Sequence, residues 1–178
     1  MGGDSLYQRI LGPSYYGLPE VLKRVHDARP LKRYRGQCRV ERGTSVLARM
    51  LAVIARLPPG SQGVPVEVTI AGRGRRESWA RRFGTHRMNS VLWQHGRFLE
   101  ERLGAVTLRF ELAATSQGIS WTLRGARFLF MPLPAAWFSA CIAHEAVDGE
   151  RYLFEVHAAV RGAGLLVRYS GWMTEHDP

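Results

Sequence analysis

The chain has 178 residues, of which 46% are hydrophobic, and a formal net charge of +10. This length suits one domain with a sizeable core, and the hydrophobic content excludes global disorder. No apolar run approaches the ~20 residues of a membrane-spanning helix, and the first residues lack the basic-then-apolar pattern of a signal peptide. We therefore expect a soluble, cytoplasmic protein.

The positive charge comes almost entirely from arginine, because only Lys23 and Lys32 of the 25 basic residues are lysines. A nucleic-acid-binding protein usually gathers such charge on one face or along one helix. Here the arginines are scattered along alternating segments, so we do not expect nucleic acid as a partner. Cys38 and Cys141 lie in strand-like surroundings, and we expect both to be small core residues rather than a disulfide.

The N-terminal region predicts two helices, Leu6 to Leu11 and Leu18 to Ala28. In the second, apolar residues recur at three- and four-residue spacing and form one stripe, made of Leu18, Val21, Leu22 and Val25. Pro30 ends this helix, since the residue before a proline avoids the helical region.

One strand and one helix follow. The strand runs from Tyr34 to Arg42, and Gly36 inside it indicates a bulge or a close approach of another backbone. Thr44 or Ser45 can cap the helix, which runs from Val46 to Leu57. Apolar residues cover more than one side of this helix, so we expect it to be buried against something large.

The rest of the chain alternates between apolar and polar residues in short segments separated by glycine-containing turns. The clearest example is Val106 to Arg124, where two alternating segments flank Ser116-Gln117-Gly118, a pattern that indicates a β-hairpin. We expect further strands at Val64 to Ile70, Glu77 to Phe83, His86 to Gln94, Arg97 to Arg102, Cys141 to Val147, Arg151 to Arg161 and Leu165 to Met173. Met131 to Pro134 is expected to be a rigid crossing and Ala135 to Phe138 a short turn of helix.

About nine or ten strands at roughly ten-residue spacing predict an α+β domain that is mainly antiparallel β. An open sheet of this size tends to curl or close, so we expect a meander curled into a barrel or half-barrel. N-terminal helices and the helix after the first strand should pack on it or in it. We divide the single domain 1–178 into N-terminal helices (1–30), a strand plus buried helix (31–62) and the antiparallel meander (63–174).

No motif in the sequence identifies a chemistry. Phosphate-binding loops and nucleophile elbows are absent, and the six histidines lack metal-binding spacing, so we expect no cofactor and no metal. Trp79, Arg81 and Phe83 share one strand face, whose orientation the pattern leaves open. If that face lines the barrel, Arg81 meets an acidic ligand or pairs with a buried Glu41 or Glu100. If it faces water, Arg81 only adds solubility.

A second pair, Glu155 and His157, lies on one face of a strand and could take part in proton transfer. The large apolar residues of that strand lie on its other face, so we place this pair on the solvated side.

The favoured hypothesis is a non-catalytic module that binds a small apolar or amphipathic acidic ligand inside the barrel. An arginine would hold the acid group, and aromatic side chains would cover the apolar body. The residues predicted to bind the ligand are Glu41, Trp79, Arg81, Arg87, Trp93 and Trp121. The alternatives are an interaction or scaffold domain with a solidly packed barrel, and an enzyme that uses a Glu–Arg or His–Glu pair.

Several patches of the sequence carry a family resemblance. They are Leu6 to Pro13, Leu18 to Asp27, Val40 to Gly43, Trp79 to Gly84, Gly125 to Pro134 and Val167 to Trp172. Together they resemble a bacterial family of domains of unknown function, number 4166 in its naming series. The resemblance covers nearly the whole chain and implies a single domain that occurs alone or attached to oxidoreductase-like domains. A scaffold domain would then serve such an oxidoreductase-like partner.

Overall fold

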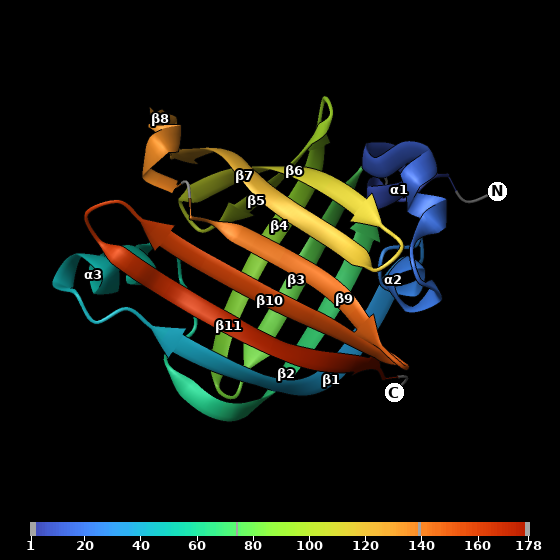
Figure 1. Ribbon diagram of the computed structural model, residues 1–178, viewed down its shortest axis with the longest axis horizontal. Helices are drawn as coiled ribbons and strands as arrows, with labels where there is room; N and C mark the ends of the chain where they lie inside the picture. Colours follow the sequence, from blue (N-terminus) through green and yellow to red (C-terminus); the bar gives the residue numbers. More distant parts are fainter. Residues whose placement is uncertain (1–2, 74, 139, 177–178) are drawn as a thin grey trace.

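The alternating segments form the wall of a closed β-barrel in the computed structural model, which describes residues 3–73, 75–138 and 140–176 (Figure 1). Within these residues, eleven strands belong to one antiparallel sheet. They are β1 Leu31–Arg42, β2 Ser61–Arg73, β3 Arg76–Phe83, β4 His86–His95, β5 Phe98–Leu103, β6 Val106–Thr115, β7 Gly118–Phe128, β8 Met131–Leu133, β9 Ile142–Asp148, β10 Arg151–Val160 and β11 Gly164–Glu175.

The barrel closes because β7 pairs on one side with β9 and on the other with β6. Ten strands thus form a ring in the order β6-β5-β4-β3-β2-β1-β11-β10-β9-β7, and β8 adds to the end of β7 outside it. The predicted antiparallel meander and its curling are confirmed. Met131 to Leu133, expected to be only a rigid crossing, pairs with β7 as this short extra strand.

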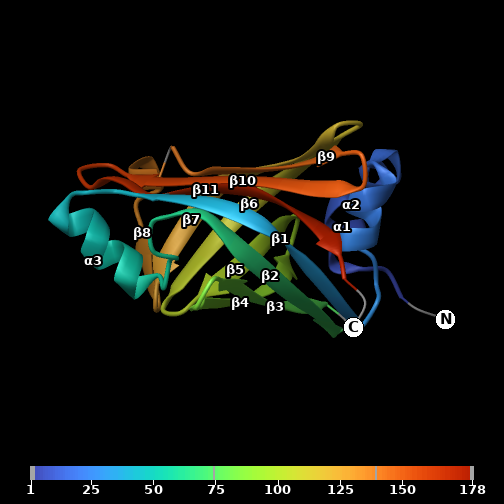
Figure 2. The same cartoon turned by 90° about the horizontal axis from the view of Figure 1, so that it is seen from below.

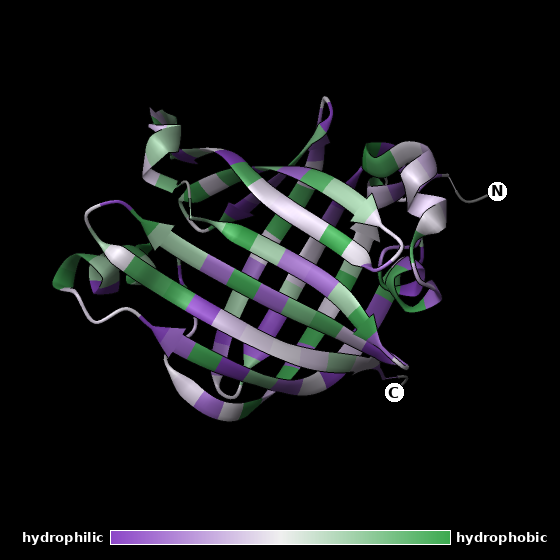
Figure 3. Ribbon diagram, viewed as in Figure 1, coloured by the Kyte–Doolittle hydropathy of each residue, from purple (hydrophilic) through white to green (hydrophobic). Residues whose placement is uncertain are grey.

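Each strand has one face towards the barrel interior and one towards solvent, which Figure 3 shows as alternating apolar and polar bands along the ribbons. On β3, Glu77, Trp79 and Phe83 are buried, whereas the residues between them are exposed, except for Arg81, which is half-buried on the inner face. This alternation is the pattern of an antiparallel sheet with its core on one side.

Helical segments lie at the two opposite ends of the barrel (Figures 1 and 2). At one end are α1 (Leu6–Leu11), the 3-10 helix η1 (Gly12–Gly17) and α2 (Glu20–Val25), while α3 (Val46–Ile54) lies at the other. A further 3-10 helix, η2 (Ala135–Phe138), follows β8. Among the described residues, none of the helices has the length and apolar content that a bilayer crossing demands.

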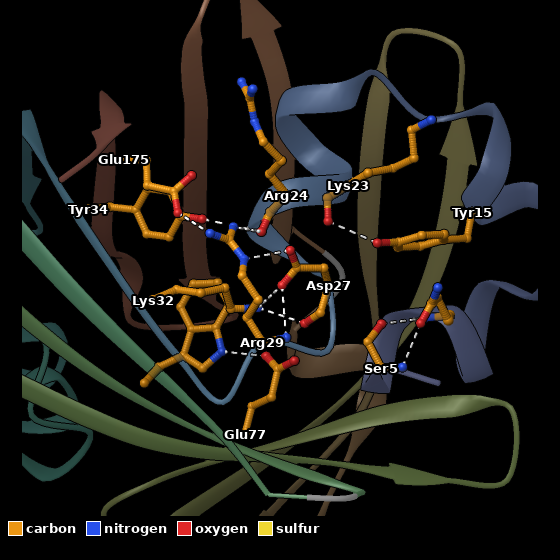
Figure 4. Close-up of polar contacts among 12 residues, drawn as sticks. Ser5, Tyr15, Lys23, Arg24, Asp27, Arg29, Lys32, Tyr34, Glu77 and Glu175 are labelled. Carbon is orange, nitrogen blue, oxygen red and sulfur yellow. Dashed lines mark hydrogen bonds and ion pairs between the residues drawn. The ribbon is translucent and has the colours of Figure 1, made fainter. Parts of the chain in front are cut away.

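Polar contacts cap the N-terminal helices and join the turn after them to the barrel (Figure 4). The hydroxyl of Ser5 accepts a hydrogen bond from the main-chain N–H of Gln8 at 3.1 Å, which caps α1. After α2, Nε of Arg29 donates to the Asp27 carboxylate at 2.7 Å, and Nζ of Lys32 donates to the main-chain oxygen of Asp27 at 2.8 Å. Arg29 also pairs with Glu175 of β11, which joins this turn to the barrel wall.

The expected burial of the helix after β1 is wrong for its large side chains. Val46 and Val53 are each 73% exposed, and the buried residues of α3 are the small Ala48 and Ala52. The helix lies across the end of the barrel, and Ala48 packs there in a cluster with Val160, Ala163 and Leu166. Since a small-residue face makes this contact, most of the large side chains are left exposed.

The close approach predicted at Gly36 is present between β1 and β11. A Cβ atom at Gly36 would lie 1.7 Å from the main-chain oxygen of Trp172, whereas one at Gly125 would have no atom within 4 Å.

We predict that Gly36→Ala lowers the free energy of unfolding by about 1–3 kcal/mol or more, because β1 and β11 must move apart to make room for the methyl group. Gly125→Ala is the matched control, expected to be neutral or stabilising by up to about 1 kcal/mol. Urea unfolding measures both, and equal effects would contradict the close approach.

Candidate functional site

The barrel encloses a cavity with a volume of about 560 Å³. This size lies within the range of roughly 300–1,000 Å³ that is typical of small-molecule sites. Its wall is mainly apolar and comes from strands all around the ring, with Val66, Phe83, Met88, Phe110, Leu123 and Phe154 among the lining residues. The interior of the barrel is therefore hollow and able to cover an apolar molecule.

The cavity reaches the surface at the α3 end of the barrel. Leu47 and Ile54 of α3 and Trp137 of η2 line it, and they are 48%, 42% and 46% exposed. Farther in, the lining residues Trp79 and Trp121 are only 4% and 6% exposed. We call the exposed end the mouth and the opposite end the floor.

The floor is closed by a buried aromatic and ionisable cluster under the N-terminal helices. The rings of Tyr7 and His26 stack with a centroid distance of 3.6 Å. Nε2 of His26, at the end of α2, donates to the Glu145 carboxylate of β9 at 2.6 Å, and both side chains are buried. Burial, together with Glu145, raises the pKa of Tyr152 well above its ordinary value, so this phenol stays neutral. The cluster ties α2 to the barrel wall.

A charged pair lies on the wall between floor and mouth. Nη2 of Arg81 lies 3.1 Å from a carboxylate oxygen of Glu101, and Nη1 donates to the hydroxyl of Ser90 at 2.7 Å. The guanidinium also stands 4.8 Å from the ring centroid of Trp79. The charge of Arg81 is thus compensated from within the barrel.

The sequence-based partners for Arg81 were wrong. Glu41 is exposed and lies near Arg39, and Glu100 is held on the outer face of β5 by Arg109 and Arg127, at 2.6 and 2.9 Å. The partner is the next residue, Glu101, because strand alternation turns it inward.

Another buried carboxylate lies near the floor, behind the cavity wall. Nε1 of Trp79 donates to Glu77 at 2.9 Å, which fixes the indole ring that lines the cavity. Burial raises the pKa of Glu77 above its ordinary value of 4.5, although the attraction of Lys32 opposes the shift. Burial likewise lowers the pKa of Lys32, which is drawn in Figure 4 and donates to the main-chain oxygen of Asp27.

Of the six predicted ligand-binding residues, the structure brings three to the cavity. Trp79, Arg81 and Trp121 line it. Glu41 and Arg87 are exposed and Trp93 is half-buried, and these three are not among the lining residues. Trp93 pairs across strands with Glu100 on the outer face, so its aromatic character alone was a poor guide to its direction.

Sequence reasoning missed the buried polar residues Glu101, Glu145 and His26. Glu101 alternates in step with Leu99 and Leu103, which are buried, so its place on an apolar face was a usable signal. Glu145 likewise shares a face with the lining residue Ala143, and His26 continues the apolar stripe of α2. The signal was an ionisable residue at a core position, which is costly to bury and therefore has a partner.

Most of the other candidate chemistry lies away from the cavity or is inactive. Glu155 pairs with Arg168 at 2.9 Å, with both side chains about half exposed, as predicted for the solvated side. The other member of the predicted pair, His157, is half-buried and is among the residues that line the cavity. Burial raises the pKa of the Cys38 thiol to about 12 and also raises that of Cys141, which makes both poor nucleophiles. In the described part of the chain, no group of three or more His, Cys, Asp and Glu residues could hold a metal ion.

Comparison with known proteins gives a family but no activity. The model of the family described as "Domain of unknown function (DUF4166)" matches residues 18–173. No curated protein gives a significant match to the chain. Among solved structures, the chain is similar to that titled "Crystal Structure of Rv2717c from M. tuberculosis", with 11% sequence identity, a TM-score of 0.47, and coverage of 90% of this chain and 99% of that one. A similarity at this level carries no argument about function.

The pairing of Arg81 can be tested against its neighbour Arg82. Arg81→Met leaves the inward carboxylate of Glu101 uncompensated, and we expect it to lower the free energy of unfolding by about 3 kcal/mol. Arg82 is half exposed and pairs with Glu67 on the outer face, so Arg82→Met should cost no more than about 1 kcal/mol. Chemical denaturation measures both, and similar losses would contradict the inward pairing of Arg81.

The raised pKa of Glu77 predicts a pH dependence. As the pH rises from about 4.5 towards neutrality, the carboxyl ionises in the unfolded chain before it does so in the folded protein, so the contribution of Glu77 to stability falls. Glu77→Gln keeps an acceptor for Trp79 but does not titrate. We therefore expect the stability of this variant relative to wild type to rise over this interval in urea unfolding. Parallel pH profiles of the two proteins would contradict the shift.

Proposed function

The chain belongs to the DUF4166 family, whose description assigns no activity, and we therefore propose from the barrel geometry that it binds a small amphipathic acid, with the apolar body inside the cavity. One observation carries the proposal: an apolar cavity of about 560 Å³ that opens at one end of the barrel. A hollow of this kind supports a binding role over a scaffold role, for which a solidly packed barrel is expected.

The apolar body of the ligand would lie between the aromatic side chains of the inner wall. Trp121 and Phe110 line the cavity and pack edge to face, with ring centroids 5.4 Å apart, and Trp79 lines it from β3. Each buried CH₂ group of a ligand gains about 0.8 kcal/mol when it leaves water. The cavity would therefore select by apolar volume, and its aromatic rings would contact the ligand together with the aliphatic side chains of the wall.

The acid group of the ligand would remain at the mouth. Arg81 is already paired with Glu101, and a ligand acid that replaced this partner would leave the Glu101 carboxylate buried and unpaired. Arg161, in contrast, lines the cavity at an exposed position and makes no ion pair with any described residue. Its main-chain N–H donates to the Trp137 oxygen at 2.8 Å, which fixes its place at the mouth. The acid anchor is thus assigned to Arg161 instead of Arg81.

A catalytic role finds less support. The two buried pairs of the types considered, Arg81–Glu101 and His26–Glu145, are each engaged internally. The second lies at the floor, where it attaches α2 to the wall, and this structural task accounts for both of its members.

Binding is tested by tryptophan fluorescence titration with palmitate. We expect saturable quenching, because three tryptophans line the cavity, Trp79, Trp121 and Trp137. Ala143→Phe places a ring in the cavity and should weaken binding at least about tenfold, a loss of about 1.4 kcal/mol. Ala146→Phe, on the opposite face of the same strand, should stay near the wild-type affinity. No response to palmitate, or equal losses in both variants, would contradict the proposal.

The anchor is tested by comparing palmitate with hexadecanol, which has the same chain length and no charge. The wild type should bind the acid more tightly than the alcohol, and Arg161→Gln should remove this preference while affinity for the alcohol stays the same. An acid preference that survives in Arg161→Gln and grows in Glu101→Gln, which frees the Arg81 guanidinium, would place the anchor at Arg81.

A further inference from the structure

The mouth of the barrel is surrounded by a continuous ring of segments, which we call the collar. It comprises α3 with its flanks (44–57), the β5–β6 turn (103–106), the β7–β8 region with η2 (127–138) and the β10–β11 turn (160–166). Contacts join these segments one to the next. The hydroxyl of Ser45 donates to the Ala163 oxygen at 2.7 Å, and the N–H of Arg161 to the Trp137 oxygen at 2.8 Å. On the other side, the Leu129 N–H donates to the Ala105 oxygen at 2.8 Å, and the adjacent Gly104 lies against the main chain of Ile54.

Exposed apolar side chains concentrate on this collar. Among the described residues, twelve large hydrophobic side chains are exposed, and nine of them belong to the collar. Five lie on α3, three in Leu129 to Met131, and the ninth is Trp137. Isolated exposed hydrophobic residues are normal, but a gathered patch at the rim of a cavity indicates a surface that contacts something outside the chain.

The β7–β8 turn gives the sharpest sign of such a contact. Leu129 and Phe130 form a two-residue connection between the paired residues Phe128 and Met131, and Leu129 has a φ of +54°. Asn and Gly are favoured at positive φ in such turns, whereas leucine there costs of order 1 kcal/mol. Phe130 is 94% exposed and so contributes little to the core. Folding alone therefore gives no reason for two apolar residues in this turn.

The charge of the collar has one sign. Its four segments contain no Asp or Glu. They do contain Arg49, Arg56 and Arg161, all exposed and without an ion pair to any described residue. A second copy of this collar would bring like charges together, so self-association through it is disfavoured. The complementary partner offers an apolar interior beneath a negatively charged surface.

We propose that the collar docks on the surface of an anionic lipid bilayer. Phe130 and the exposed apolar residues of α3 enter the boundary between head groups and acyl chains, and the collar arginines contact the phosphates. In this orientation the mouth of the cavity faces the membrane. The collar contacts do not depend on what fills the cavity, so the proposal is independent of the proposed function.

Vesicle co-sedimentation at low salt tests the proposal with two lipid compositions, phosphatidylcholine alone and phosphatidylcholine mixed with phosphatidylglycerol. The wild type should partition onto the mixed vesicles, and Phe130→Ser should reduce this at least about tenfold. Tyr16→Ser is the matched control, since Tyr16 is 66% exposed at the floor end and should not matter. The double variant Arg49→Gln/Arg56→Gln should lose about fivefold per charge, with a weaker salt dependence. Arg33→Gln should lose little, because Arg33 is exposed at the floor end of β1.

Contrary results would overturn docking through the collar. Equal binding of Phe130→Ser and Tyr16→Ser would show that general positive charge holds the protein. An absence of vesicle binding, with a wild-type dimer in sedimentation velocity that Phe130→Ser dissociates, would make the collar a contact between copies of the chain. Ala143→Phe, which fills the cavity, should bind vesicles as wild type does, so failure of ligand binding and failure of docking are distinguishable. Because Phe130 is exposed, its replacement leaves the core intact, and circular dichroism can verify this.

Discussion

The pairing of β7 with both β6 and β9 is the constraint on which the interior of this protein depends. It removes the free edges of the sheet and gives every strand of the ring one inner and one outer face. A slip of one residue in a strand would exchange these faces. On β3 such a slip would bring Arg82 inward and place Arg81 in water. The cavity and its buried charges therefore follow from closure.

The two ends of the barrel differ in the side chains that they bury and expose. At the floor, buried ionisable groups engage partners, as His26 does with Glu145 and Lys32 with Asp27, whereas the hydroxyl of Tyr7 has none among the described residues. At the mouth, α3 contacts the wall through Ala48, and its large side chains remain outside. One end thus shields polar groups from water, and the other leaves apolar groups in it. The cavity therefore has one closed end, the floor, and one open end, the mouth.

Much of the fold could be predicted from the sequence, because period-two alternation is a local property that each strand carries by itself. Which face of each strand points into the barrel could not be predicted in the same way. The inner face of β3 holds both aromatic and charged residues, so its orientation depends on the neighbouring strands. The same limit explains the partner of Arg81: alternation with Leu99 and Leu103 places Glu101 on the inner face of β5, but its position beside Arg81 depends on the registers of β3, β4 and β5. Trp93 shows the reverse error, because a large aromatic residue also suits a half-buried outer face.

The seam between β1 and β11 has a consequence for how the chain reaches this fold. Tyr34 pairs with Glu175, and Arg42 with Val167, so strands from opposite ends of the sequence lie side by side. During synthesis, β1 leaves the ribosome long before β11 and must wait with one edge unpaired. Such distant pairings slow folding and expose unpaired edges to other chains. The seam makes ring closure a late event, because β1 gains its second neighbour only after β11 has been made.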